Sequence, residues 1–300
     1  MSLKKTRVEL NNAVFSLPDY VARDEGYFEA HGLDVELVQP ARRREAMAAR
    51  AAPVADPAQV RSFLWHAGFE EGEFSVYHAC EWGQMRRSQD SCVGAKVITK
   101  RAAVSSQAII VRPDAAYHTP QDLTNVPVAV NFHAGSHYIT VGLLSGFMPR
   151  EAVEVVHIGV PNQRFEALAQ GRVAAATLME PWITVAEKLG YKLIAESFYV
   201  GLEVADPSVD PETYRALDRA HRMAVRQLRA DVRPYLKYLI AEVPGDIVTL
   251  APEDFHLNRL RYVDPEPYSP EEFQKTHDWM VSWGLIEPEG YRELVDSRAS

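Results

Sequence analysis

The chain has 300 residues, of which 47% are hydrophobic and 24% are charged, so it is long enough for two domains with sizeable cores. Its 32 basic and 41 acidic residues give a net charge of −9, and Arg42-Arg43-Arg44 is too short a basic run to indicate a nucleic-acid partner. No apolar run is long enough to span a membrane, so we expect no membrane insertion.

The start of the chain and its two cysteines leave the cellular location and the redox state open. The start, residues 1–7, is polar and has no apolar segment typical of a secretion signal. This predicts a cytoplasmic protein if the chain is complete as given, and a periplasmic or membrane-associated one if a signal was removed. Cys80 and Cys92 are too few for a disulfide framework, and spacing does not decide their redox state.

In chain order, predicted strands alternate with predicted helices to about residue 200, and helices dominate afterwards. Residues 11–18 are predicted as a strand end and turn, and residues 39–57 as loosely structured. The predicted strands are 7–14, 33–38, 74–78, 96–99, 106–112, 126–130, 153–157, 173–178 and 192–195. The predicted helices are 20–30, 58–70, 120–123, 139–147, 162–170, 183–189, 211–224, 231–242, 252–257, 270–283 and 288–297.

One stretch stands out, Asn131-Phe132-His133-Ala134-Gly135-Ser136-His137-Tyr138, which joins an apolar strand to a helix. The first N–H groups of such a helix have no partner inside it, and the helix dipole is positive there. Together these features can hold a carboxylate, sulfonate or phosphate. Gly135 would let the backbone approach a ligand closely, and Ser136 could cap the helix or donate. An ordinary capped helix is the alternative.

Several segments resemble substrate-binding proteins for nitrate, sulfonates, taurine and thiamine precursors. The run 20–38 contains Gly26-Tyr27-Phe28 and Gly32-Leu33-Asp34-Val35, which match a motif of that family. The further matches are 120–123, 165–176, 180–182 and 279–286.

The resemblance implies an α/β, two-lobed type II periplasmic-binding-protein fold, with mixed, mostly parallel sheets and a helical C-terminal part. Lobe one would comprise residues 1–104 plus 200–300, and lobe two residues 105–199. Two crossover strands, near 104–105 and 198–202, would form a hinge, and the lobes would close on a ligand in the cleft between them.

Ligands of open α/β sheets bind outside the carboxyl ends of strands, which selects the candidate site residues. Glu180 could receive an amine or ring N–H of the ligand, or could simply favour a helix dipole. The aromatic candidates could clamp a planar ligand, although core packing is their usual role. The predicted ligand-binding residues are Asn12, Phe15, Ser16, His78, Cys80, Glu81, Trp82, Phe132, His133, Gly135, Ser136, His137, Asn162, Glu180 and Trp182.

Metal binding and covalent catalysis are alternatives for some of these residues. The spacing of His78, Cys80, Glu81, His133 and His137 matches no common metal motif, so we expect neither metal nor cofactor. Cys80 could be a nucleophile with His78, His133 or His137 as its base and Glu81 orienting that base, although a half-buried cysteine that packs as a small apolar residue is the alternative.

Two enzymes that resemble the same family bear on that alternative. A desulfinase of aromatic sulfinates has its cysteine after the first strand, where this chain has Phe15 or Ser16, so that nucleophile does not carry over. A pyrimidine synthase of thiamine biosynthesis holds pyridoxal phosphate on a lysine after the third strand. No lysine lies between Phe74 and Met85 here, which argues against that chemistry.

We therefore expect a protein that binds a small, planar or heterocyclic organic solute. It would be the substrate-binding component of an ABC importer, with an ABC permease as its partner if it is exported. The alternative is a cytoplasmic lyase or hydrolase, desulfinase-like, which uses His78, Cys80 and Glu81; a cytoplasmic ligand sensor is a third reading.

Overall fold

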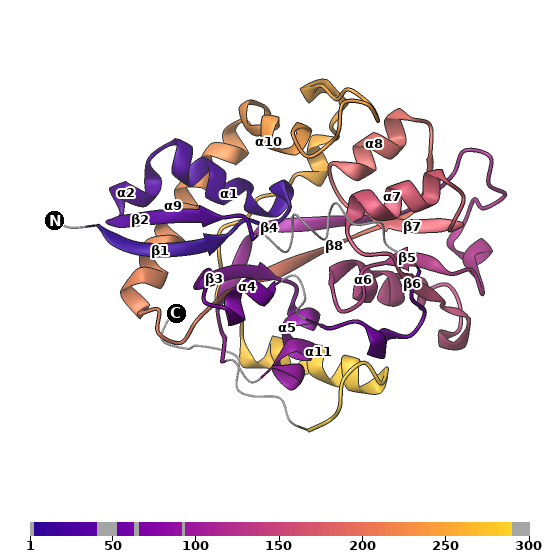
Figure 1. Cartoon of the computed structure of the whole chain (residues 1–300), viewed down its shortest axis with the longest axis horizontal. Coiled ribbons are helices and arrows are strands. Elements are labelled where there is room, and N and C mark those ends of the chain that lie inside the picture. Colours follow the sequence, from indigo (N-terminus) through magenta and orange to yellow (C-terminus); the bar gives the residue numbers. More distant parts are fainter. Residues whose placement is uncertain (1–2, 41–52, 63–65, 92–93, 290–300) are drawn as a thin grey trace.

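A computed structural model describes residues 3–40, 53–62, 66–91 and 94–289, and it contains one curled sheet with helices on its faces (Figure 1). The strand order is β2-β1-β3-β8-β4-β7-β5-β6. β1 is parallel to β2 and β3, and β5 is parallel to β6 and β7. Between these parallel halves lie β4 and β8, which pair with each other antiparallel. The expected α/β architecture with mixed sheets is confirmed.

The strands follow apolar runs of the sequence, and their core positions are buried. Each predicted strand has a counterpart. The strands are β1 Lys4–Glu9, β2 Leu33–Val38, β3 Val76–Ala79, β4 Lys96–Val111, β5 Val128–Val130, β6 Val155–His157, β7 Ala175–Leu178 and β8 Lys192–Ala205.

The helices include the predicted helical C-terminal part, in which α9 begins with Pro211 after an Asp210 cap and buries an apolar face against α1 and α2. The helices are α1 Ala13–Asp24, α2 Tyr27–Ala30, α4 Ala67–Glu70, α5 Glu81–Asp90, α6 Gly135–Leu144, α7 Pro161–Ala169, α8 Trp182–Lys188, α9 Pro211–Ala230, α10 Lys237–Ile240 and α11 Pro270–Ser282. The predicted helix 288–297 lies almost entirely outside the described residues.

Several predicted elements differ from the structure. The strands expected at 96–99 and 106–112 are one continuous strand, β4, and the strand expected at 192–195 extends to Ala205. The helix expected from residue 20 begins at Ala13, because its residues there are buried even though Pro18 lies inside it. The range 58–70 is helical only in α4 and in a 3₁₀ turn, Pro57–Gln59, and residues 63–65 lie outside the described residues.

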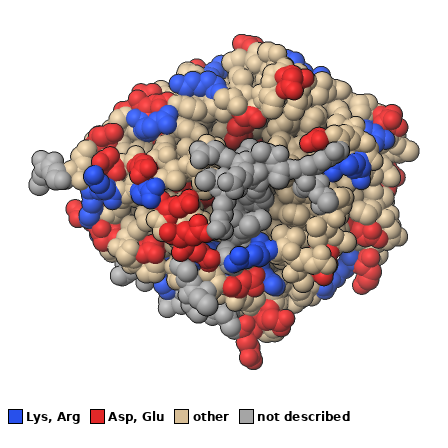
Figure 2. Space-filling model, viewed as in Figure 1, with Lys and Arg blue, Asp and Glu red and all other residues tan. Residues whose placement is uncertain are grey.

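Two long strands and one backbone bridge tie the halves of the sheet together. β4 and β8 run through both halves, and they contain the expected crossover positions 104–105 and 198–202. The segment after residue 52 also reaches across, because Val54 exchanges two backbone hydrogen bonds with His157 of the edge strand β6. On the face shown in Figure 2, acidic and basic side chains are interspersed. No helix within the described ranges is long and apolar enough to cross a membrane.

Candidate functional site

A cavity of about 100 Å³ lies where the ends of strands from both halves of the sheet meet. His78 and Cys80 reach it from the end of β3, and Asn131 to Ser136 reach it from the turn between β5 and α6. The middle strands contribute Arg101, Gln107 and Tyr199. The cavity is therefore built from segments far apart in the sequence, as expected for a ligand site at the carboxyl ends of strands.

Buried polar atoms without a hydrogen-bond partner among the described residues gather around this cavity. Buried polar groups are normally paired, so a local concentration of unpaired ones indicates atoms that a ligand or water would satisfy. The atoms of this kind that belong to residues lining the cavity are Ser62 Oγ, His78 Nδ1, Gln84 Nε2, Arg101 Nη2, Gln107 Oε1, Asn131 Oδ1 and His133 Nδ1.

Two fully buried arginines face the cavity without an ion-pair partner among the carboxylates of the described residues. Arg101 donates from Nε to the Ala103 carbonyl at 3.1 Å, and its guanidinium carbon lies 3.9 Å from the centre of the Phe15 ring. Arg164 donates from Nε to the Thr177 carbonyl at 2.7 Å. Burial lowers the pKa of both guanidinium groups, that of Arg164 to about 9. An uncompensated buried cation costs several kcal/mol, which an anionic ligand would offset.

A third arginine, Arg87 on α5, also lines the cavity, but Glu70 lies 3.5 Å from its Nη2. Its charge is therefore already matched. The two unmatched cations, Arg101 and Arg164, come from the middle of the sheet and from α7, so a bound anion would lie between the two halves.

His78 is connected to a buried chain of charged groups. Its Nε2 lies 2.8 Å from Asp19 Oδ2, and His221 Nε2 lies 3.0 Å from the other carboxylate oxygen, Oδ1. His221 Nδ1 in turn lies 3.2 Å from Glu203 Oε2. Asp19 is ionised, because its two histidine partners hold the pKa of the carboxyl well below its usual range despite burial. The pKa of His221 is raised well above its usual value by Glu203 and Asp19, although burial opposes the shift, so His221 is charged.

The turn between β5 and α6 is strained and closely packed. His133 has a φ of 59°, a left-handed conformation that few non-glycine residues adopt and that often marks functional sites. The Ser136 hydroxyl accepts a hydrogen bond from the Asn131 N–H at 2.9 Å, so it closes the turn. A side chain at Gly135 would overlap the Tyr199 hydroxyl of β8. Glycine is therefore required at position 135 because the backbone there lies close to the Tyr199 side chain of the same chain, and not because of a ligand.

Cys80 is a free, buried cysteine whose thiol serves as the cap of α5. Its Sγ accepts a hydrogen bond from the Gly83 N–H at 3.2 Å. Burial raises the pKa of the Cys80 thiol to about 12, so it is protonated at neutral pH and is a poor nucleophile. Cys92 lies outside the described residues.

The structure brings together about half of the residues predicted from the sequence. His78 and Ser136, from the two halves of the sheet, line the same cavity. The predicted residues that line it are Asn12, Phe15, His78, Cys80, His133, Gly135 and Ser136.

Glu81 and Trp82 line a different cavity of about 570 Å³. The Tyr268 hydroxyl donates to Glu81 Oε2 at 2.6 Å, so this carboxylate does not orient His78. The physical reason is α5, a helix that was not predicted: it begins at Glu81, so Glu81 and Trp82 belong to its first turn rather than to a turn at the end of β3.

The remaining predicted residues are not among those that line the first cavity, and most of them are packed inside the protein. The Ser16 hydroxyl accepts from the Asn11 N–H, Trp182 packs on Phe165, and Asn162 lies in the first turn of α7. Phe132 and His137 are buried against each other with ring centres 5.0 Å apart, and burial lowers the His137 pKa to about 3.

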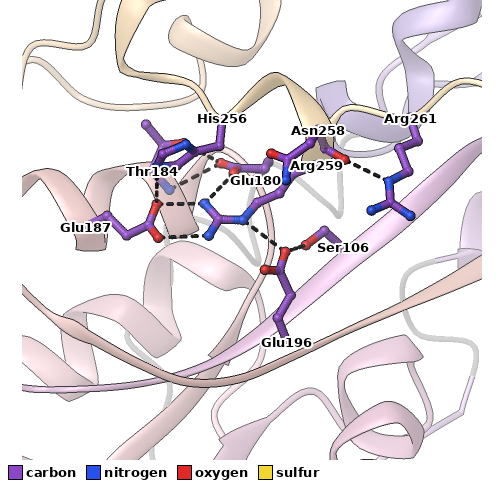
Figure 3. A network of polar contacts seen from close by, with 9 residues as sticks. All are labelled: Ser106, Glu180, Thr184, Glu187, Glu196, His256, Asn258, Arg259 and Arg261. Carbon is purple, nitrogen blue, oxygen red and sulfur yellow. Dashed lines mark hydrogen bonds and ion pairs between the residues drawn. The ribbon is translucent and has the colours of Figure 1, made fainter.

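Glu180 is held in a separate network around Arg259 (Figure 3). Its Oε2 accepts from the Thr184 N–H and hydroxyl, and its Oε1 lies 3.7 Å from Arg259 Nη1. Arg259 also binds Glu187 through two hydrogen bonds of 2.6 and 2.8 Å, and Glu196 through one of 2.9 Å. Glu180 therefore contacts Thr184 of α8 and Arg259 of the C-terminal segment, and it is not one of the residues that line the cavity.

The predicted site residues include none of the arginines that line the cavity and, of its amides, only Asn12. Arg101 and Arg164 are the two of these arginines that have no carboxylate partner among the described residues. A signal existed for Arg164, because it shares a face of α7 with the buried residues Ala167 and Leu168. No group of histidine, cysteine, aspartate and glutamate in the described part of the chain is arranged to hold a metal ion.

Comparison with known families decides the classification. The model of the NMT1-like family matches residues 10–198, nearly two thirds of the chain. The chain belongs to the NMT1-like family. A search of curated proteins finds no match.

Solved structures share the fold of this NMT1-like protein at low sequence identity. The alkanesulfonate-binding protein SsuA from Xanthomonas axonopodis pv. citri, bound to MOPS, has a TM-score of 0.75 at 15% identity and covers 99% of each chain. A ligand-binding component of an ABC-type import system from Staphylococcus aureus, with zinc bound, has a TM-score of 0.70 at 13% identity, covering 100% of this chain and 98% of that one. DSZB in complex with biphenyl-2-sulfinic acid has a TM-score of 0.61 at 13% identity, covering 97% and 95%. These likenesses establish the two-lobed periplasmic-binding-protein fold for this NMT1-like protein.

Proposed function

We propose that this protein binds a small organic anion in the cavity between its lobes, as the substrate-binding component of an ABC importer. The observation that carries the proposal is the pair of buried, unmatched arginines, Arg101 and Arg164, on one cavity. The N-terminal end of α6 at Gly135 and Ser136 adds a positive dipole on the same cavity. Structures of the same fold include sulfonate- and nitrate-binding proteins, which supports an anionic solute.

The size and the lining of the cavity limit the size and the chemical type of the ligand. A cavity of roughly 150 Å³ can hold benzene. The present cavity is smaller, about 100 Å³, so it suits a ligand of a few heavy atoms unless the lobes separate further. The rings of Phe15 and Tyr199 in its lining support a planar or heterocyclic ligand within that limit.

The proposal includes the lobe boundaries, the partner and the location. Lobe one would comprise residues 1–104 plus 200–300 and lobe two residues 105–199, with β4 and β8 as the hinge. The partner would be an ABC permease, and the protein would act outside the inner membrane. The permease and the location rest on the function of the structural neighbours.

The test replaces Arg101 by methionine, which has similar length and no charge. Loss of a charged hydrogen bond should weaken binding of small carboxylates or sulfonates about ten- to hundredfold. Without ligand the Arg101→Met protein should be more stable to urea than the parent, because it no longer buries an uncompensated cation. Isothermal titration calorimetry and urea unfolding measure the two effects.

Arg112→Met is the matched control, because Arg112 pairs with Asp114 at the surface. It should change neither affinity nor stability by more than about 0.5 kcal/mol. Unchanged anion affinity in Arg101→Met would refute the proposed site.

A lyase or hydrolase on the same fold is the second candidate. The Asp19–His78 pair favours it, since a carboxylate that orients an imidazole is typical of a general base. The protonated thiol of Cys80 and the remote bonding of Glu81 weigh against it. Turnover that Cys80→Ala or His78→Ala abolishes while ligand binding persists would select the enzyme.

A further inference from the structure

We propose that the bound ligand is a monoanion that also carries its own hydrogen-bond donor, a hydroxyl or amino group, which donates to Nδ1 of His78. This inference rests on the proposed anion site and specifies the chemical class that the site accepts.

The first step is the orientation of the His78 ring. Its Nε2 lies 2.8 Å from Asp19 Oδ2, and an ionised carboxylate can only accept a hydrogen bond. The proton of neutral His78 is therefore on Nε2, and Nδ1 presents a lone pair. That Nδ1 is buried in the lining of the cavity and has no partner among the described residues.

The second step is the charge balance around the cavity. Apart from the pairs that Arg87 makes with Glu70 and His66 makes with Glu9, the cations are Arg101, Arg164 and His221, and the anions of the buried chain are Asp19 and Glu203. With neutral His78 these groups sum to +1, and one monoanion brings the sum to zero. A proton on His78 would restore an excess positive charge in a buried region, which is costly.

The third step concerns the other groups that face His78. Cys80, next to it on β3, is a protonated thiol, and Asn11 Nδ2 from the end of β1 donates to the His78 backbone carbonyl at 3.3 Å. From α9, His221 donates to Asp19 rather than to His78. Within the described residues, none of these groups supplies a donor to Nδ1, so the donor must come from the ligand or from water.

Further orphan acceptors support the same ligand class. Gln107 Oε1 and Asn131 Oδ1 are buried without partners among the described residues, and they belong to the middle strand β4 and to the turn after β5. Donors without partners there include Arg101 Nη2 and Gln84 Nε2. A compact molecule with an acidic end and a donor-bearing end satisfies both sets, whereas a plain alkyl anion leaves the acceptors unpaired.

The experiment compares isosteric pairs of probes on the whole protein by isothermal titration calorimetry at pH 7.5. Glycolate and propionate differ only by a hydroxyl in place of a methyl group, and aminomethanesulfonate and ethanesulfonate differ by an amino group in place of a methyl. We expect the donor-bearing member of at least one pair to bind tenfold or more tightly than its partner. Titrations in two buffers of different ionisation enthalpy should show no proton uptake on binding.

Three outcomes separate the possibilities. Equal affinity within both pairs, with binding weakened by Arg101→Met, overturns this inference and leaves the anion site standing. Uptake of one proton on binding also overturns it, because His78 is then a donor. Absence of binding for all four anions overturns both the anion site and this inference.

The variant His78→Phe removes the acceptor and keeps a ring. In this variant the donor-bearing probe should bind less than threefold more tightly than its isosteric partner, while both anions still bind. Far-ultraviolet circular dichroism and thermal unfolding check its fold. If that variant does not fold, the isosteric pairs and the proton count on the parent protein still decide.

Discussion

At the scale of single residues, the carboxyl group of Glu180 is the clearest case in which burial overrides ordinary acid chemistry. Burial raises its pKa to about 7, against the effect of the Thr184 hydrogen bonds and of Arg259. In the unfolded chain the same group has a pKa near its usual value of 4.5. The folded state therefore binds the proton more tightly than the unfolded state between these two pH values.

This difference predicts a pH-dependent stability. The contribution of Glu180 is fully present below about pH 4.5 and is lost as the pH rises through 7, a change of about 3 kcal/mol. The variant Glu180→Gln cannot ionise, so its free energy of unfolding should not show this decrease between pH 4.5 and pH 7. Urea unfolding at pH 5, 6, 7 and 8 measures it, and parallel pH profiles for the variant and the parent would show that Glu180 is not responsible.

The arginines of the cavity show what a sequence can and cannot reveal at this scale. His78, His133 and Ser136 could be predicted because they follow apolar strands directly, and strand ends are where ligands bind. Arg101 could not, because it lies between two segments predicted as separate strands and is in fact buried inside one long strand. Local pattern does not show which way a residue points when both faces of a strand are covered.

At the scale of elements, the regular strands and most helices were predictable because apolar periodicity reflects which face is buried. The helix α5 was not, since its sequence Glu81–Asp90 is mostly polar and only part of it is buried. Its N-terminal end is fixed by the Cys80 thiol and by contact with the other half of the molecule, which are tertiary features.

That contact gives a prediction for Gly83. A methyl group there would lie 2.6 Å from the His133 carbonyl oxygen and 2.9 Å from Cys80 Sγ. Gly83→Ala should therefore force α5 away from the β5–α6 turn, lowering stability by roughly 1–3 kcal/mol and weakening ligand binding. Thermal unfolding and calorimetric titration measure these effects.

Gly245→Ala is the matched control, because a methyl group at Gly245 meets no atom within 4 Å. It should leave binding unchanged and alter stability only slightly. If Gly83→Ala behaves like this control, the approach of α5 to the turn does not contribute to the site.

At the scale of the whole molecule, the family resemblance read from short motifs was enough to predict the fold, and the NMT1-like match and the solved structures confirm it. Motif order reflects the order of elements, which fixes topology. Motif order does not determine the identity of the ligand. That identity depends on side chains such as Arg164 and Gln107, which line the cavity but are not part of the family motifs.

The C-terminal segment is joined to the second half of the sheet by Arg259 (Figure 3). Its guanidinium binds Glu187 of α8 and Glu196 of β8, and it is almost fully buried. Arg259→Met leaves these carboxylates without their cation and should lower the free energy of unfolding by about 3 kcal/mol at pH 8.

Arg233→Met removes an exposed pair with Asp231 and should cost less than about 1 kcal/mol. Urea unfolding of both variants makes the comparison. Equal effects would mean that the Arg259 network does not hold the C-terminal segment in place.

The backbone pairing of Val54 with His157, together with the 2.9 Å bond between His133 Nε2 and the Pro57 carbonyl, has a kinetic consequence. The segment that follows residue 52 is attached to the far half of the sheet on the rim of the ligand chamber, and Ser62 on the same segment lines that chamber. Any movement that separates the two halves of the sheet at this rim has to break these contacts. Two main-chain hydrogen bonds and one histidine-to-carbonyl contact would have to open together, which would slow the exchange of a bound guest.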